Sequence, residues 1–371
     1  MLDDGWFGGR DSDETSLGDW EVNSRKLPAG LSLLGQRIGE LRMRFGLWME
    51  PEMISPQSEL YRNHPEWCIA VPGREPAVGR NQLVLDLGRE EVRSYIIDTI
   101  SEILSSAPVS YLKWDMNRNL TDTASAELTA ERQGEVAHRY VLGLYSVLDR
   151  IRAGFPKLLM EGCAGGGGRF DMGMLYYMPQ IWTSDNTDAV SRLKIQYGTS
   201  LIYPPVSMGA HVSAVPNHQV GRSTSLETRA HVAFGGVFGY ELDVAALEEW
   251  EKKQIREQIA WYRRHRRLIQ FGDFMRLESP FHTNEAAWMF ISEGGGEILV
   301  FHFTIMREAN TASRLLPLAG LPPDRRYRDV RTGRIYGAGE LLYRGLPLCA
   351  ARNDFESRIT HLHATNEHES A

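Results

Sequence analysis

The strongest constraint on the fold is a recurrent pattern of short apolar or aromatic runs that end abruptly in polar residues. Stretches with apolar residues at spacings of three and four separate these runs, and this spacing is typical of amphipathic helices. The runs are too apolar to face water on either side, which indicates a parallel sheet covered by helices. We expect the strands at residues 45–49, 109–114, 158–160, 180–183, 206–210 and 237–240.

Polar residues directly after each predicted strand favour a closed (β/α)8 barrel, because the active site of that fold collects at the carboxyl ends of its strands. Helices are expected at residues 90–105, 129–153 and 245–269. Six complete strand–helix units are visible, and the opening Leu2-Asp3-Asp4-Gly5-Trp6 is typical of the end of another. A barrel needs eight, so we predict one that is incomplete at its N-terminus and lacks its first strand, which leaves a parallel edge exposed.

The hydrophobic period changes after Phe274. Residues 287–292 and 298–303 flank a glycine-rich turn at 293–297, which predicts an antiparallel hairpin. Further short strands are expected at residues 330–331, 334–336 and 340–343. The chain is therefore predicted to be an α/β protein with a barrel over residues 1–275, followed by a small antiparallel β-sandwich domain over residues 276–371.

Composition excludes several classes of function. The 371 residues include 41 Lys and Arg against 48 Asp and Glu, a net charge of −7, so there is no broad basic surface for nucleic acid. No apolar run approaches the length of a membrane span. The three cysteines, Cys68, Cys163 and Cys349, lack paired spacing, which excludes a disulfide framework and fits a cytoplasmic protein. Assembly into a homo-oligomer stays open.

The triplet Lys113-Trp114-Asp115 comes at the predicted end of a strand. Because side chains alternate along a strand, Lys113 and Asp115 are expected on one face and Trp114 on the other. An ammonium group beside a carboxylate lowers the pKa of that carboxylate and keeps it ionised, which suits a nucleophile. The alternative is a structural salt bridge at the mouth of the barrel.

A second acid follows another strand two units later, in the segment Thr183-Ser184-Asp185-Asn186-Thr187-Asp188. If the carboxyl groups of Asp115 and Asp185 converge to about 5 Å, they form the acid pair of a retaining glycosidase. One would attack the anomeric carbon and the other would protonate the leaving oxygen. The alternative is that Asp185 or Asp188 caps the following helix, a common position for Asp after a strand.

Consecutive glycines at 165–168 follow Cys163 directly after a predicted strand. They let the backbone approach a ligand where any Cβ would collide. The segment has neither the GxxxxGK[ST] order of a phosphate loop nor a GxGxxG that opens a helix, so a nucleotide site is weakly supported. The alternative is a flexible surface turn.

Further acids, a Trp and an Arg occur at the same predicted rim, in residues 3–6, 46–52 and 79–82. Carboxylates that grip vicinal hydroxyls, with an indole stacked on a pyranose face, would explain this set. A catalytic metal is the rival interpretation. No HxxEH or HxH ligand pattern accompanies the acids, so we predict no metal and no cofactor, and we interpret His211 and His218 as loop or core residues.

Taken together, these residues resemble the α-galactosidases of glycoside hydrolase family 36. The matching segments lie in the order of the family between residues 2 and 213. They are LDDGWFG, SLGDW, GLWMEPEM, GRNQLVLDL, LKWDMNR, MEGCAGGGGRFD, WTSDNTDA and MGAHVS. The resemblance covers nearly the whole barrel portion and, less specifically, the C-terminal strands.

The resemblance implies a role for each matching residue. Asp115 would be the nucleophile and Asp185 the acid/base. Asp3 and Asp4 would hold the 4- and 6-hydroxyls of galactose. The other implied substrate-binding residues are Trp48, Arg80, Lys113, Asn117, Cys163 and Gly165, with Arg80 and Lys113 at the nucleophile or the sugar and Cys163 and the glycines at the 2-hydroxyl side.

The implied function is that of a retaining exo-α-galactosidase that acts on melibiose- or raffinose-type oligosaccharides without a cofactor. Members of the family carry an N-terminal β-sandwich and a first barrel strand that have no counterpart in these residues. One alternative is therefore a catalytically silent sugar-binding or scaffold fragment of such an enzyme. Another is a relative that transfers galactose to sugar acceptors rather than to water.

Overall fold

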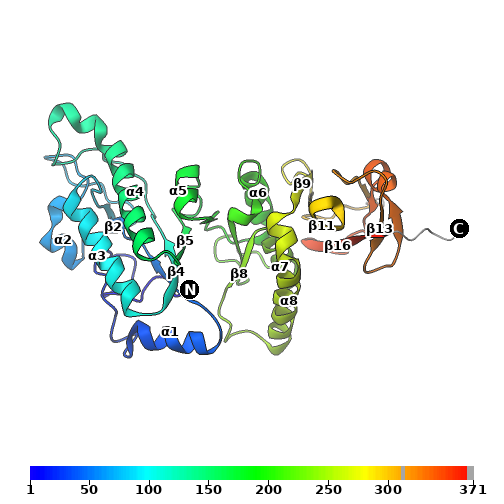
Figure 1. Cartoon of the computed structure of the whole chain (residues 1–371), viewed down its shortest axis with the longest axis horizontal. Helices are drawn as coiled ribbons and strands as arrows, with labels where there is room; N and C mark the ends of the chain where they lie inside the picture. Colours follow the sequence, from blue (N-terminus) through cyan, green and yellow to red (C-terminus); the bar gives the residue numbers. More distant parts are fainter. Residues whose placement is uncertain (311–313, 366–371) are drawn as a thin grey trace. The chain divides into compact units, whose positions relative to one another are not determined.

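The computed structural model describes residues 1–310 and 314–365 (Figure 1). They form two compact units: unit 1 is Met1–Trp182 and unit 2 is Thr183–Ala371. Within the described part of the chain, no helix has both the length and the apolar character needed to span a membrane.

Unit 1 is built on parallel strands in the order β1 (Phe45–Met49), β4 (Val109–Trp114), β5 (Leu159–Gly162) and β6 (Gln180–Trp182). Every residue of β1 is buried, as expected for a strand covered on both faces. Leu2 forms a parallel bridge with Leu47, and its amide donates to the Gly46 carbonyl at 2.8 Å. The opening residues therefore lie beside β1 as the end of a further parallel strand, as predicted.

The helices of unit 1 include the two amphipathic helices predicted from apolar spacing. Helix α3 (Glu90–Ser106) matches its prediction to within a residue, and it packs against α4 (Val136–Gly154). The predicted helix 129–153 is α4 preceded by the 3-10 turn η2 (Ala130–Glu135). The remaining elements are α1 (Gly30–Glu40), β2 (Met53–Ile54), α2 (Glu59–Asn63), η1 (Pro65–Trp67), β3 (Leu83–Val84) and α5 (Met172–Tyr177).

Unit 2 begins with α6 (Ala189–Thr199) and continues through η3 (Pro205–Ser207), β7 (Met208–Ser213), α7 (Leu226–Ala233) and β8 (Val237–Glu241). Strands β7 and β8 are parallel. The predicted strand 206–210 was placed too early. A 3-10 turn that starts at Pro205 occupies its first residues, and β7 extends beyond 210, so that His211 lies inside the strand.

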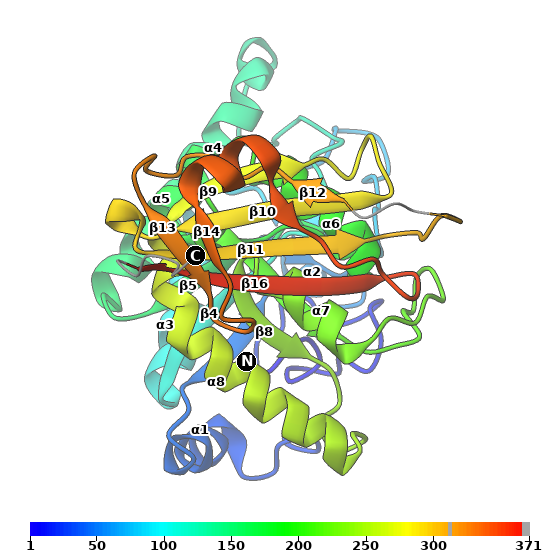
Figure 2. The same cartoon turned by 90° about the vertical axis from the view of Figure 1, so that its right-hand side faces the viewer.

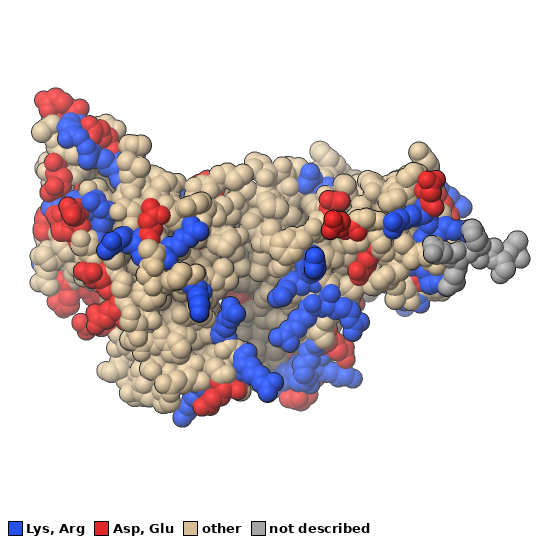
Figure 3. All heavy atoms as spheres, viewed as in Figure 1, with Lys and Arg blue, Asp and Glu red and all other residues tan. Residues whose placement is uncertain are grey.

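Helix α8 (Glu249–Phe271) begins later than the predicted residue 245. A capping box explains the start, because the Glu248 side chain accepts from the backbone of Glu251 and the Glu251 side chain accepts from the amide of Glu248. Lys and Arg side chains gather over this helix in Figure 3. The Lys and Arg residues of α8 are Lys252, Lys253, Arg256, Arg263, Arg264, Arg266 and Arg267.

An antiparallel sheet follows α8, and Figure 2 shows it beside that helix. Its strand order is β14 (Ile335–Gly337), β13 (Arg326–Asp329), β16 (Glu356–Thr365), β11 (Glu297–Thr304), β10 (Glu285–Ile291) and β9 (Asp273–Glu278). The predicted hairpin is β10 and β11, joined through η4 (Glu293–Gly295). A second small sheet pairs β12 (Leu315–Leu316) with β15 (Leu346–Pro347). The predicted division of domains after residue 275 stays a prediction.

Two short strands predicted in this region are wrong. Residues 330–331 form a turn after β13, because the Asp329 carboxylate accepts from the backbone amides of Arg331 and Thr332. Residues 340–343 belong to a π-helical turn, η5 (Glu340–Arg344), which the Gly345 amide closes by donating to the Glu340 carbonyl. The apolar pair Leu341-Leu342 satisfies a strand pattern and a helical turn equally well, so the sequence did not separate them.

A close approach between α4 and the loop before α3 generates a prediction for unit 1. A Cβ on Gly143 would lie 2.0 Å from the Leu87 carbonyl oxygen. Gly143→Ala is therefore expected to lower the free energy of unfolding by about 1–3 kcal/mol, the usual cost of overpacking. Gly154→Ala in the same helix is the control, since no atom lies within 4 Å of its added Cβ. Denaturant titration followed by circular dichroism measures both, and equal stabilities of the two variants would contradict the packing argument.

Candidate active site

Asp115 is the centre of the site in unit 1. It follows β4, and its amide donates to the Met49 carbonyl at 2.8 Å, which fixes it beside the end of β1. Its Oδ2 accepts from Trp48 Nε1 at 3.1 Å and from Asn117 Nδ2 at 2.8 Å, and its Oδ1 accepts from the Met116 amide at 2.8 Å. The structure therefore brings together three of the predicted site residues, with the carboxylate of Asp115 held in one orientation.

Lys113 lies on the same strand, two residues before Asp115. Its Nζ is 3.6 Å from Asp3 Oδ2, so the buried lysine joins the strand end to the N-terminal segment. Two further predicted residues, Asp3 and Lys113, are thus in contact. The effect of Lys113 on the ionisation of Asp115 stays a prediction.

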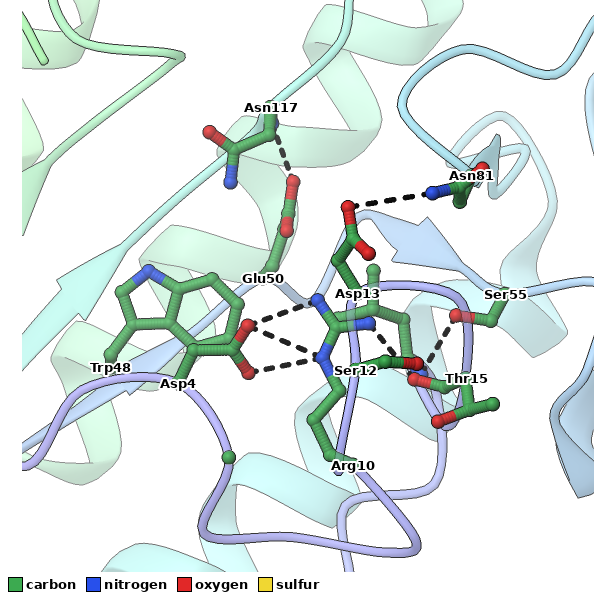
Figure 4. Close-up of polar contacts among 12 residues, drawn as sticks. Asp4, Arg10, Ser12, Asp13, Thr15, Trp48, Glu50, Ser55, Asn81 and Asn117 are labelled. Carbon is green, nitrogen blue, oxygen red and sulfur yellow. Dashed lines mark hydrogen bonds and ion pairs between the residues drawn. The ribbon is translucent and has the colours of Figure 1, made fainter. Parts of the chain in front are cut away.

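Asp4 is held by a residue that sequence reasoning missed. The Arg10 side chain is buried, and its Nε and Nη2 donate to the Asp4 carboxylate at 3.1 and 3.0 Å, as Figure 4 shows. Arg10 Nη1 donates to the Thr15 carbonyl at 2.9 Å. This two-pronged arrangement fixes the plane of the carboxylate as well as its position. An arginine between Gly9 and Asp11 carries no periodic signal that would have revealed this role.

Cys163 follows β5, and its amide donates to the Trp114 carbonyl at 2.8 Å. Burial, and next the charge of Asp115, raise the pKa of the Cys163 thiol far above its ordinary value. Cys163 therefore lies next to Asp115 as a neutral thiol, and its place at the 2-hydroxyl side of the sugar stays a prediction.

The backbone conformation of the segment after Cys163 requires glycine. Gly165 and Gly166 have positive φ angles of 54° and 86°, and a Cβ on Gly168 would lie 2.6 Å from the Ala164 carbonyl oxygen. A cavity of about 530 Å³ adjoins this segment, and its wall includes Asn117, Gly165 and Arg169. Two predicted substrate-binding residues thus face one cavity in unit 1.

Arg80 lies on the exposed loop before β3. Arg80 and Asn81 both have left-handed backbones, with φ of 50° and 58°, and the Asn81 side chain donates to Asp13 at 3.4 Å. Non-glycine residues in this region are strained and occur preferentially at functional sites. The contact of Arg80 with the nucleophile or the sugar stays a prediction.

Unit 2 carries the second predicted acid in the segment after β6. Asp188 is the N-cap of α6, where it accepts from the Ser191 amide at 2.9 Å and pairs with Arg222. Asp188, not Asp185, therefore has the capping role, and Asp185 lies exposed in the same segment. Its predicted distance from Asp115 stays a prediction.

The backbone of this segment is anchored by Arg192, which sequence reasoning did not single out. The Arg192 guanidinium is buried and donates to the carbonyls of Ser184 and Gly209 at 3.0 and 2.8 Å. Arg192 lies on the first turn of α6, one turn after the Asp188 cap.

Glu50 and Glu52 contradict the prediction that the carboxylates in residues 46–52 grip vicinal hydroxyls of a sugar. Both carboxylates are completely buried, so they do not grip sugar hydroxyls. Glu52 accepts from Trp114 Nε1 at 2.7 Å and from the two terminal nitrogens of Arg169 at 2.9 and 2.8 Å, and it also accepts from the Tyr140 hydroxyl. Glu50 accepts from Gln82 and from the Asn117 amide. The two acids after β1 are therefore buried acceptors that hold residues around Asp115 in place.

Among the described residues, His265, Glu297 and His361 are the group whose ligand atoms could hold a metal ion, all within 4.8 Å of one another. His265 Nδ1 and His361 Nε2 lie 3.1 and 2.9 Å from the same oxygen of Glu297. These hydrogen bonds account for the cluster without an ion, and none of the predicted site residues belongs to it.

Comparison with known proteins decides the family. The melibiase family model matches residues 1–272, and the model of the glycosyl hydrolase family 36 C-terminal domain matches residues 285–362. The chain belongs to glycoside hydrolase family 36. It is 59% identical over 367 residues to α-galactosidase AgaA of Geobacillus stearothermophilus and 47% identical over 366 residues to α-galactosidase Mel36A of Lactobacillus acidophilus. These alignments cover 99% of the chain and 50% of each relative, so the chain spans about half their length.

Solved structures agree with this assignment. A variant of AgaA in complex with raffinose has a TM-score of 0.96 at 59% identity, over 98% of this chain and 51% of that structure. The α-galactosidase from Lactobacillus brevis has a TM-score of 0.97 at 44% identity, over 100% of this chain and 51% of that structure. The predicted fold class, a (β/α)8 barrel portion followed by an antiparallel β domain, is confirmed.

The buried Glu52–Arg169 pair yields a prediction of stability. Glu52→Gln keeps the size of the side chain but leaves the Arg169 guanidinium without its counter-charge, so the free energy of unfolding is expected to fall by about 3–5 kcal/mol. Glu135→Gln, which breaks solvent-exposed pairs with Arg132 and Arg139, is expected to change stability little. Urea titration measures both variants, and a loss of stability for Glu135→Gln as large as that for Glu52→Gln would contradict the role of burial.

The cysteines provide a second prediction. Cys349 is exposed, whereas Cys68 and Cys163 are buried, and burial raises the pKa of Cys68 to about 12. Because the thiolate is the reactive form, iodoacetamide at mildly alkaline pH should modify Cys349 and spare the other two in the folded chain. Peptide mass spectrometry identifies the modified residue, and Cys349→Ser should leave the protein unlabelled. Rapid labelling of Cys163 would show that the strand ends beside Asp115 are open to solvent.

Proposed function

We propose that this chain carries the catalytic machinery of a retaining exo-α-galactosidase. The observation that carries the proposal is the Asp115 carboxylate at the end of β4, oriented by the Trp48 indole and the Asn117 amide. A carboxylate held in this way is ready to attack without first reorganising its surroundings. Membership of family 36 and the α-galactosidase names of the relatives support the choice of substrate.

In the proposed mechanism, Asp115 attacks the anomeric carbon of a terminal galactosyl residue. The bond between that carbon and the glycosidic oxygen breaks, and Asp185 gives its proton to the leaving oxygen. Galactose is then bound to Asp115 as an ester. Asp185, now ionised, takes a proton from water, and the resulting hydroxide displaces Asp115 from the anomeric carbon, which restores both acids.

The remaining residues bind the sugar in this proposal. Asp3 and Asp4 accept hydrogen bonds from the 4- and 6-hydroxyls, and Arg10 holds the Asp4 carboxylate in the orientation for that task. Because Trp48 is buried with its Nε1 committed to Asp115, it shapes the wall of the pocket and orients the nucleophile. Cys163 and Gly165 border the 2-hydroxyl side.

The proposed substrates are α-galactosides of the raffinose type. AgaA variants have been solved in complex with raffinose and with stachyose, which supports oligosaccharides as ligands of this chain. Chromatography of the products formed from raffinose tests the finer assignment. Release of free galactose supports hydrolysis, whereas galactosyl oligosaccharides would identify a transferring relative.

The two acids have distinguishable roles, which gives a test by substitution. Asp115→Asn should abolish turnover of every α-galactoside, including aryl substrates with good leaving groups, because no covalent intermediate can form. Asp185→Asn should spare the first step on activated aryl substrates, which need little protonation, but not on raffinose. Release of the aryl group and of galactose, measured separately, separates the two steps.

Asp188→Asn is the matched control in the same segment. It weakens the cap of α6 and should lower stability, while the ratio of aryl-substrate to raffinose turnover stays that of the unmodified chain. Equal losses on both substrates in Asp185→Asn would remove the acid/base role from Asp185. Absence of all hydrolysis by the unmodified 371-residue chain would favour the silent sugar-binding alternative.

A further inference from the structure

The pairing register of β1 with β4 places Glu50 beside Asp115. Strands β1 and β4 are parallel, Met49 pairs with Trp114, and the Asp115 amide donates to the Met49 carbonyl at 2.8 Å. Residues 50 and 115 thus occupy equivalent positions just beyond adjacent strands. The Glu50 side chain has no exposed surface, so it does not touch a sugar.

The contacts of Glu50 lead to the nucleophile through one residue. Glu50 Oε1 accepts from the backbone amide of Asn117, a contact drawn in Figure 4. The side chain of the same Asn117 donates from Nδ2 to Asp115 Oδ2 at 2.8 Å. On the other side, Glu50 Oε2 accepts from Gln82 Nε2 at 3.1 Å. Glu50 therefore connects the loop before β3 with the residue that orients Asp115.

We propose that Glu50 is a positioning residue for Asp115, which fixes the Asn117 backbone and thereby holds the Asn117 amide against the nucleophilic carboxylate. This inference rests on the proposed function, in which Asp115 attacks the sugar. Loss of the Glu50 side chain would free the Asn117 backbone and let the Asp115 carboxylate rotate, although no group in contact with the substrate changes.

The charge of Glu50 matters because an ionised Glu50 would repel the Asp115 carboxylate. The charged groups that act on Glu50 are Asp115, which follows β4, and Arg80, which lies on the loop before β3. Burial, and next the charge of Asp115, raise the pKa of Glu50 to about 8. Below this pH Glu50 is protonated and adds no second negative charge beside Asp115.

Gln82 can form a hydrogen bond with either the ionised or the protonated form of Glu50. Its amide nitrogen donates to the ionised carboxylate, whereas its Oε1 is buried and has no hydrogen-bond partner among the described residues. A half-turn of the amide would present Oε1 to the proton of neutral Glu50. The neutral acid therefore has an acceptor available, which a buried hydroxyl requires.

The test compares two substitutions at this position by the pH dependence of kcat on an activated aryl α-galactoside. Glu50→Gln is neutral at every pH and keeps an oxygen for the Asn117 amide. It should retain kcat at neutral pH and lose the decline that the unmodified chain shows as pH rises through about 8. Glu50→Ala removes the anchor and should lower kcat by up to about 100-fold with little change in KM, because the substrate contacts remain.

Two further variants separate positioning from a general structural effect. Combining Glu50→Ala with Asn117→Ala should cost no more kcat than Asn117→Ala alone, since both break one chain of contacts. Glu135→Gln is the control, because Glu135 is an acid in exposed pairs with Arg132 and Arg139, outside the contacts of Asp115. It should leave both kcat and the alkaline decline in place. A kcat for Glu50→Ala equal to that of the unmodified chain, or additive losses in the double variant, would overturn the proposal.

A measurement without turnover distinguishes failure of this inference from failure of the proposed function. In the chain labelled with ¹³C at the glutamate carboxyls, the Glu50 signal is identified by its absence in Glu50→Gln. Its midpoint should lie near pH 8 and should fall in Asp115→Asn, which removes the neighbouring charge. A midpoint that Asp115→Asn leaves unmoved would overturn the contact between the two acids, whether or not the chain hydrolyses galactosides.

Discussion

Withdrawing a carboxylate from water costs several kcal/mol unless hydrogen-bond donors and a counter-charge replace the lost solvent. Glu52 meets this requirement through partners from three separate parts of unit 1: Trp114 at the end of β4, Tyr140 on α4 and Arg169 after the glycine segment. Asp115 directly follows Trp114, and Cys163 precedes the glycines. One buried side chain therefore sets where the strand ends and the glycine segment lie, and the geometry around Asp115 depends on it.

The acids of unit 1 differ in what compensates their charge. Asp4 has a buried guanidinium in two-pronged contact, and Asp3 lies near the Lys113 ammonium. Glu50 is held by two neutral amide donors, so its ionised form lacks a paired cation in direct contact among the described residues. Burial without a contacting cation therefore raises the pKa of the Glu50 carboxyl.

The sequence predicted much of the fold because buried strands and amphipathic helices have strong periodic signals. The strand 45–49 and the helix 90–105 agree with β1 and α3 to within a residue. The predictions that were wrong concern places where a local interaction decides the outcome: the turn made by Asp329, the cap at Glu248 and the π-helical turn after Gly339. Side-chain contacts of this kind have no period, so pattern analysis does not register them.

The candidate site shows the same contrast between what sequence patterns predict and what local side-chain contacts decide. The resemblance to family 36 marked Asp115, Trp48 and Asn117 as residues of one site. The motif GLWMEPEM also contains Glu50 and Glu52, but residue type alone does not tell a carboxylate that faces a sugar from one that lies beneath the site. Arg10 and Arg192 were missed because hydrogen bonds to a carboxylate or to backbone carbonyls leave no periodic pattern in the sequence.

Arg192 has a consequence for how the second acid can work. Its guanidinium donates to the backbone carbonyls of Ser184 and Gly209, and these acceptors do not titrate. Burial lowers the pKa of Arg192 to about 10, which still leaves it charged throughout the neutral range. The charge of Asp185 acts on Arg192 and raises the pKa of that guanidinium. Arg192 therefore stays protonated whichever protonation state the proposed acid/base at Asp185 is in. The hydrogen bond that holds the Ser184 backbone is then kept through the whole catalytic cycle.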